Sequence, residues 1–120
     1  MYGYELQHIL DRGVWIKNLN AEVVSKDKLP ERKPYHIKAY IVNTDPSTEE
    51  GEHWVAVIFN ANNDIFYFDS YGFPPMEKEV LNFIQDHTTR WTFNKQTLQS
   101  LLGQTCGAYC IFALTAASQG

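Results

Sequence analysis

Four residues of this sequence have side chains that together could supply a nucleophile, a base, a carboxylate that orients the base and an oxyanion donor. Cys106 begins a late apolar stretch, and the free N–H groups and macrodipole of a helix N-terminus would favour its thiolate. His53 lies directly before an apolar run, where its imidazole could act as a base, and Asp69 follows the next run, where it could orient that imidazole. Gln99 lies seven residues before Cys106 and could donate an N–H to an oxyanion.

A predicted β-hairpin brings the base and its orienting carboxylate together. Residues 54–59 (WVAVIF) and 65–68 (IFYF) are apolar runs separated by the turn-forming residues 60–64 (NANND). In an antiparallel pair, the residue before the first strand and the residue after the second lie at the same end of the ladder. The spacing therefore predicts that His53 faces Asp69, and the continuous apolar run predicts a first strand buried on both faces.

The remaining elements follow from hydrophobic periodicity and turn residues. Residues 4–10 predict a short helix, 15–34 mostly loop with a short helical turn near position 21, and 36–42 a strand. Residues 76–87 place Val80, Leu81, Ile84 and His87 at helical spacing and predict an amphipathic helix. Residues 90–93 predict a strand and 94–103 a loop. Residues 105–117 are apolar nearly all round and predict a buried central helix. This order of helices and strands indicates one α/β or α+β domain over residues 1–120.

Composition excludes several classes of protein. The 120 residues carry ten Lys and Arg against fourteen Asp and Glu, a net charge of −4, whereas nucleic-acid binders are usually basic, so DNA is not an expected partner. Two cysteines are too few for a secreted disulfide framework and indicate a reducing compartment. No apolar run of 18 residues and no signal peptide are present, so we expect a soluble intracellular protein that does not bind membranes.

Each candidate residue also has a purely structural interpretation. A cysteine on an apolar segment is often a small buried hydrophobe, and Cys110 is best interpreted that way. His53 could be a hydrogen-bonded histidine at a strand edge, Asp69 a turn former and Gln99 a surface amide. Only their joint spacing favours the catalytic interpretation.

The other histidines and tryptophans are assigned to structure rather than chemistry. No nucleophile or acid is expected beside His8, His36 or His87, and we interpret Trp54 and Trp91 as core or cleft wall. The Cys-x-x-x-Cys spacing at the last apolar stretch lacks a second ligand pair, which argues against zinc. Phosphate-loop, serine-hydrolase and zincin motifs are absent from the sequence, so we expect neither metal nor cofactor.

These segments resemble the adenain-like cysteine proteases, the family of the adenovirus maturation protease. The resemblance rests on residues 39–44 (AYIVNT), 51–55 (GEHWV), 68–73 (FDSYGF), 99–100 (QS) and 105–110 (TCGAYC), in that order, and covers most of the chain. Proteases of ubiquitin-like modifiers are similar but have the glutamine one residue nearer the cysteine. The seven-residue step here favours the viral branch.

The resemblance implies an α+β, papain-like or adenain-like fold with a mixed sheet and a buried nucleophile helix. It also implies a thiol endopeptidase that processes viral or virus-like structural precursors at Gly-containing sites, in the nucleus of a host cell or in a virion. Catalysis would use His53 as general base, Asp69 as orienter, Cys106 as nucleophile and Gln99 as oxyanion donor. Substrate contacts would come from Gly51, Trp54 and Gly107, the last keeping the nucleophile turn uncluttered.

The sequence also departs from adenain, and the departures leave alternatives open. Asp69 stands where adenain has Glu. No cysteine lies between His53 and Cys106 that could tether an activating peptide by a disulfide. Activation by a peptide that binds without a disulfide remains an open alternative. The negative charge does not support activation by DNA. Adenain continues beyond its nucleophile helix whereas this chain ends at Gly120, so we expect either a minimal enzyme or a missing C-terminal part. A deconjugating protease of ubiquitin-like modifiers and an inactive, peptide-binding fragment are the alternatives.

Overall fold

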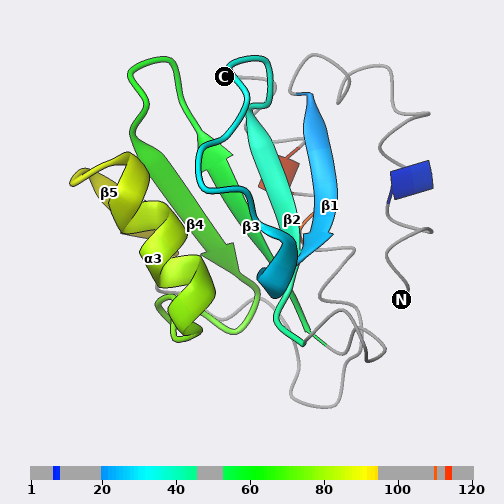
Figure 1. Ribbon diagram of the computed structural model, residues 1–120. Helices are drawn as coiled ribbons and strands as arrows, with labels where there is room; N and C mark the ends of the chain where they lie inside the picture. Colours follow the sequence, from blue (N-terminus) through cyan, green and yellow to red (C-terminus); the bar gives the residue numbers. More distant parts are fainter. Residues whose placement is uncertain (1–6, 9–19, 46–52, 95–109, 111–112, 115–120) are drawn as a thin grey trace.

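A mixed five-stranded sheet forms the centre of the computed structural model, which describes residues 7–8, 20–45, 53–94, 110 and 113–114 (Figure 1). The strands lie side by side in chain order: β1 (Ala21–Ser25), β2 (Ala39–Asn43), β3 (Trp54–Phe59), β4 (Ile65–Asp69) and β5 (Trp91–Phe93). The outer pairs β1–β2 and β4–β5 are parallel, and the inner pairs are antiparallel. Helix α3 (Lys78–His87) connects β4 to β5, which gives the predicted α+β class with a mixed sheet.

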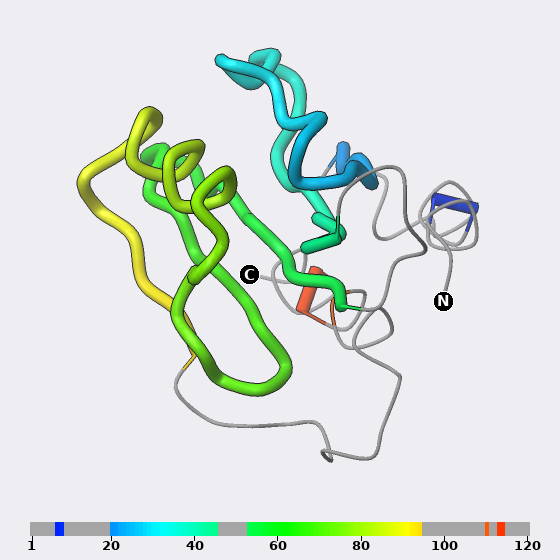
Figure 2. The backbone as a smooth tube through the Cα atoms, turned by 60° about the horizontal axis from the view of Figure 1, so that its bottom comes forward, coloured from blue at the N-terminus to red at the C-terminus, as the bar shows by residue number. Residues whose placement is uncertain are grey.

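The inner strands are apolar because both faces of the sheet are covered. Every residue of β2 and β3 is buried, so the prediction of a first hairpin strand buried on both faces is confirmed. On one face, Val80, Phe83 and Ile84 of α3 pack against alternate residues of β2, β3 and β4. On the opposite face, the helical residues Cys110, Ala113 and Leu114 pack against Ala39, Ile41, Trp54, Ala56, Ile58 and Phe68. In the backbone view of Figure 2, the strands lie between α3 and the red segment near the C-terminus.

The predicted hairpin is present with the predicted bounds of its first strand. The second strand ends one residue later than predicted, at Asp69. In the turn, the side-chain oxygen of Asn60 accepts hydrogen bonds from the N–H groups of Asn62 (3.1 Å) and Asp64 (3.0 Å). Asn63 adopts a positive φ of 60°, a conformation that asparagine tolerates in turns. This turn fixes the register of β3 against β4.

One element was predicted wrongly: residues 21–25 form strand β1, not loop or a helical turn. The strand is an edge strand whose side chains are only partly buried, so it shows no clear alternation in the sequence. It exists because Val23 and Val24 pair in parallel with Ile41 and Val42 of β2. A short 3-10 helix, η1 (Lys26–Lys28), follows directly.

Other bounds differ from the predictions by a few residues. Strand β2 begins at Ala39 rather than position 36, and α3 begins at Lys78 but ends, as predicted, at His87. In α3 the buried residues are Val80, Phe83 and Ile84, whereas Leu81, predicted to share their face, is only partly buried. Of the predicted first and last helices, residues 7–8, 110 and 113–114 are helical, and the rest, like most of the predicted loop 94–103, lie outside the described residues.

In the described part of the chain, none of the helices has the length and apolar character that crossing a membrane requires.

His87 is structural, as predicted: its Nδ1 hydrogen-bonds the Phe83 carbonyl oxygen (2.7 Å), and its Nε2 accepts a hydrogen bond from the Lys33 N–H (3.0 Å). The histidine thus joins the end of α3 to the segment between β1 and β2.

Tyr40 is a buried polar residue at the contact between α3 and the sheet. Its side chain is 1% exposed and meets the ring of Phe83 edge-on, with ring centroids 5.5 Å apart. Within the described part of the chain, its hydroxyl has no hydrogen-bond partner. Burial, with a smaller contribution from Glu22, raises the pKa of Tyr40 to about 12. An unsatisfied buried hydroxyl is a net cost to folding.

Replacing Tyr40→Phe should therefore stabilise the protein by about 1–3 kcal/mol, the cost of an unsatisfied buried polar group. Tyr35→Phe is the matched control, because Tyr35 is 88% exposed and its hydroxyl is hydrated in both states. Urea unfolding followed by circular dichroism measures both free energies of unfolding. A Tyr40→Phe variant less stable than the wild type would contradict the prediction and indicate a partner for this hydroxyl.

Candidate active site

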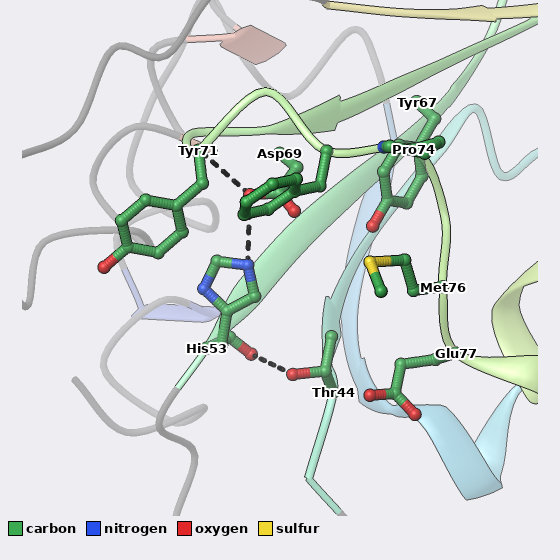
Figure 3. Close-up of a pocket in the computed structure, with 9 residues that line it drawn as sticks. Thr44, His53, Tyr67, Asp69, Tyr71, Pro74, Met76 and Glu77 are labelled. Atoms are coloured by element: carbon green, nitrogen blue, oxygen red, sulfur yellow. Dashed lines mark hydrogen bonds and ion pairs between the residues drawn. The ribbon is translucent and has the colours of Figure 1, made fainter. Parts of the chain in front are cut away.

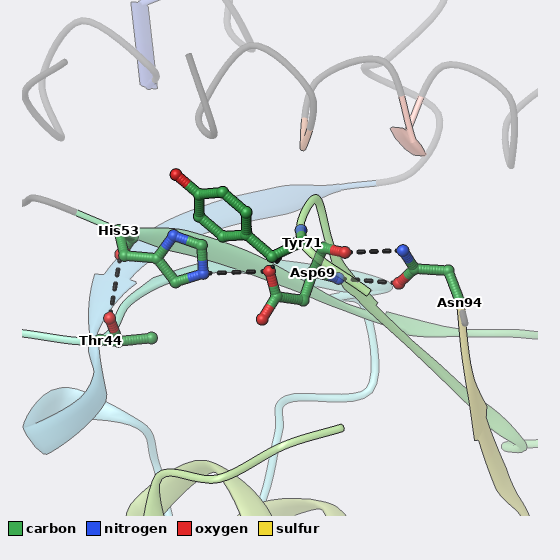
Figure 4. A network of polar contacts seen from close by, with 5 residues as sticks. All are labelled: Thr44, His53, Asp69, Tyr71 and Asn94. Atoms are coloured by element: carbon green, nitrogen blue, oxygen red, sulfur yellow. Dashed lines mark hydrogen bonds and ion pairs between the residues drawn. The ribbon is translucent and has the colours of Figure 1, made fainter. Parts of the chain in front are cut away.

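His53 and Asp69 lie together at the open end of the β3–β4 hairpin, as the spacing predicted (Figure 4). His53 immediately precedes β3, and Asp69 is the last residue of β4. In the observed register Val55 lies opposite Asp69. Because residues two apart on a strand share a face, His53 is the diagonal neighbour of Asp69. The distance from His53 Nε2 to Asp69 Oδ1 is 3.1 Å.

The carboxylate of Asp69 is buried and accepts a hydrogen bond from a backbone N–H. The residue is 5% exposed, so its negative charge needs hydrogen bonds inside the protein. Oδ1 accepts one from the Tyr71 N–H (2.9 Å) in addition to its contact with His53. The chain turns immediately afterwards: the Gly72 N–H donates to the Asp69 carbonyl oxygen (2.8 Å), and Gly72 adopts a φ of 78°, which favours glycine. The turn therefore places two N–H donors, those of Tyr71 and Gly72, in hydrogen-bonding distance of Asp69.

His53 is held through both its backbone and its imidazole. The backbone N–H and the hydroxyl of Thr44 both donate to the His53 carbonyl oxygen, at 3.0 and 3.3 Å. The ring of Tyr71 stacks on the imidazole, with centroids 5.2 Å apart and an interplanar angle of 29°. The imidazole is 25% exposed and therefore remains partly in contact with solvent.

This arrangement selects one protonation pattern of the imidazole. The nitrogen that faces a carboxylate carries the hydrogen, so Asp69 favours the Nε2–H tautomer. Nδ1 is then the nitrogen that can accept a proton from a nucleophile, and the carboxylate stabilises the imidazolium that results. The pair can therefore act as a general base with its orienting group.

A pocket of about 430 Å³ opens beside the pair (Figure 3). The described residues that line it are Thr44, His53, Tyr67, Asp69, Tyr71, Phe73, Pro74, Met76 and Glu77. Burial raises the pKa of the Tyr67 phenol, and the nearby Asp69 carboxylate raises it further, so Tyr67 keeps its hydroxyl proton. At the rim, Phe73 and Met76 are exposed, and Glu77 forms an ion pair with Lys26 (3.0 Å). The pocket combines apolar walls with acidic groups.

Not all predicted site residues fall in the described part of the chain. The structure brings His53 and Asp69 together, whereas Gly51, Gln99, Cys106 and Gly107 lie outside the described residues, and their roles stay predictions. Trp54 is 3% exposed and packs in the core with Cys110, so its contact with a substrate also stays a prediction. The burial of Cys110 at 0% confirms its interpretation as a small core residue.

Three residues of the site were not predicted: Thr44, Tyr71 and Asn94. Asn94 Oδ1 accepts a hydrogen bond from the Asp69 N–H (2.9 Å), and its Nδ2 donates to the Asp69 carbonyl oxygen (2.6 Å). The turn residues after Asp69 were a usable signal for Tyr71, since a short turn returns its own N–H groups to the carboxylate. Asn94 has no such local signal. Among the described residues, no group of three or more His, Cys, Asp or Glu could hold a metal ion.

Comparison with known proteins shows that the sequence of this chain is similar to those of cysteine proteases. No family model matches the chain. Over 96 residues it is 31% identical to a SUMO-1 cysteine protease of African swine fever virus, and equally to a cysteine protease of the Badajoz strain. Each match covers 71% of this chain and 35% of the relative, so the chain spans about a third of the relatives' length.

A solved structure also aligns with the chain. It is the crystal structure of an African swine fever virus protease, with a TM-score of 0.44 and 28% identity over 70% of this chain and 36% of that one. The sequence identity, rather than this superposition, carries the relationship. Over most of its own length, the chain is homologous to cysteine proteases of African swine fever virus.

Proposed function

We propose that this chain carries the catalytic groups of a cysteine endopeptidase. The observation that carries the proposal is the 3.1 Å contact between His53 Nε2 and Asp69 Oδ1, in which the carboxylate oxygen is itself held by a backbone N–H. Homology to proteins named cysteine proteases supports the same chemistry. In this proposal Cys106 is the nucleophile, His53 the general base, Asp69 its orienter and Gln99 an oxyanion donor.

The proposed reaction proceeds through a thioester. His53 accepts the thiol proton of Cys106, and the thiolate attacks the carbonyl carbon of the scissile peptide. The negative charge that develops on the carbonyl oxygen is stabilised by the Gln99 amide and the Cys106 backbone N–H. The imidazolium then protonates the leaving amine as the C–N bond breaks. A water molecule that gives its proton to His53 hydrolyses the thioester, releases the acid and returns the thiol.

We propose viral or virus-like structural precursors, cleaved at Gly-containing sites, as the substrates. Two of the matched relatives are viral cysteine proteases, which supports this choice. Gly51, Trp54 and Gly107 would contact the substrate backbone, and no cofactor takes part. The corresponding setting is a host cell, its nucleus or a virion.

A second candidate function is deconjugation of a ubiquitin-like modifier. It is favoured by the name of one relative, a SUMO-1 cysteine protease. A SUMO-1 probe with a C-terminal vinyl group separates the two functions. Labelling of Cys106 by the probe, seen by mass spectrometry, would favour deconjugation. Cleavage of Gly-containing library peptides by a chain that the probe does not label would favour the precursor protease.

The first kinetic prediction concerns the reactivity of Cys106. With a thiolate stabilised by His53, iodoacetamide should alkylate Cys106 well below pH 8, faster than free cysteine. His53→Ala should remove this advantage because it removes the positive partner of the thiolate. His36→Ala is the matched control, since His36 is exposed and contacts Tyr35 rather than the site. Mass spectrometry at several pH values gives the rate and separates Cys106 from the buried Cys110.

Two outcomes of the alkylation experiment would count against the proposed function. Reaction of Cys106 at the rate of free cysteine would favour the inactive, peptide-binding fragment. An equal loss of rate in His53→Ala and His36→Ala would show that no particular imidazole activates the thiol.

The second kinetic prediction concerns Gln99. Gln99→Ala should lower kcat by roughly 10² to 10³, the usual effect of removing one oxyanion donor. The rate of Cys106 alkylation should stay unchanged, because the amide acts on the transition state and not on the thiolate. Both rates are measured on the same preparation, with a peptide selected from a cleavage library. A parallel fall of alkylation and turnover would assign Gln99 to thiolate formation instead.

A further inference from the structure

Beside Asp69, the side-chain amide of Asn94 takes the place of a paired strand residue. The β4–β5 ladder ends at the pair Tyr67 and Phe93, so the backbone of Asp69 lies beyond its last pair. There Asn94 Oδ1 accepts a hydrogen bond from the Asp69 N–H, and Asn94 Nδ2 donates to the Asp69 carbonyl oxygen, at 2.9 and 2.6 Å (Figure 4). One amide thus satisfies both backbone groups of Asp69, as a paired strand would.

These two hydrogen bonds hold the backbone of Asp69, which carries the carboxylate side chain. An aspartate side chain has only two torsions, so the position of Oδ1 follows closely from the position of its backbone. Residue 69 ends a strand and begins a turn: its carbonyl oxygen also accepts a hydrogen bond from the Gly72 N–H (2.8 Å), whereas its own N–H is held by Asn94 Oδ1. The Tyr71 N–H then holds Oδ1 itself at 2.9 Å, within reach of the imidazole. The distance from Oδ1 to His53 therefore depends on Asn94.

We propose that Asn94 is a positioning residue, which acts on the reaction by holding Asp69 in hydrogen-bonding distance of His53. Its kinetic consequence rests on the proposed protease function, whereas its effect on the imidazole does not. Asn94 lies five residues before Gln99 and twelve before Cys106 in the sequence. The hydrogen bonds of the Asn94 side chain therefore also anchor position 94 to β4, and the chain continues from there to Gln99 and Cys106.

The test uses the full chain, labelled with ¹⁵N, and reads the His53–Asp69 hydrogen bond directly. An imidazole Nε2–H bonded to a buried carboxylate gives a downfield proton resonance, and its loss in His53→Ala assigns it. In Asn94→Ala this resonance should move upfield or broaden, and kcat on the library-selected peptide should fall about 10- to 100-fold with little change in KM. Asn94→Asp keeps the shape and the acceptor but loses the donor, so it should shift both readouts in the same direction.

The control is Asn82→Ala, which removes the same side chain from the exposed surface of α3 and should leave both readouts unchanged. If Asn94→Ala does not fold, Asn94→Asp decides. The proposal is overturned if the resonance and kcat stay at wild-type values in the folded variants, even where Tm falls, because the role would then be structural only. Absence of the resonance from the wild type would overturn it as well. A resonance that responds to Asn94 in a chain without peptidase activity would support the positioning role and refute the proposed function.

Discussion

The contact between His53 and Asp69 depends on the register of a single β-hairpin. In the observed register Val55 lies opposite Asp69, which puts the imidazole and the carboxylate on the same face of the sheet. A slip of one residue would send the two side chains to opposite faces, because side chains alternate along a strand. The turn centred on Asn60 and the burial of every β3 residue on both faces prevent such a slip.

Burial of the carboxylate explains the polar structure around it. A charged group with 5% exposure is costly unless hydrogen bonds replace its hydration, and this cost applies before any reaction takes place. The tight turn after β4 supplies the Tyr71 N–H, and the amide of Asn94 satisfies the backbone of the same residue. These groups hold both the carboxylate and the backbone of Asp69 by hydrogen bonds. An imidazole such as that of His53 is held in one orientation more effectively when its carboxylate partner is itself fixed.

The two covered faces of the sheet confine polar chemistry to its end. Residues of α3 fill one face, and the helical residues Cys110, Ala113 and Leu114 fill the other. In the three inner strands, the charged side chain, that of Asp69, accordingly comes where a strand ends. His53, Asp69 and the pocket beside them lie at that place. The sheet therefore acts as a rigid support for groups carried at its edge, a common arrangement in proteins whose loops carry function.

The sequence by itself determined the hairpin, the end of α3 and the pairing of His53 with Asp69, because apolar runs, turn residues and helical spacing are signals within a few residues. Strand β1 escaped prediction since it is stabilised by pairing with β2, which lies eighteen positions later in the register. The contact of Asn94 with Asp69 was decided only by the tertiary structure, because the two residues are 25 positions apart in the sequence. Such contacts form when the folded sheet brings distant segments together, and no local pattern encodes them.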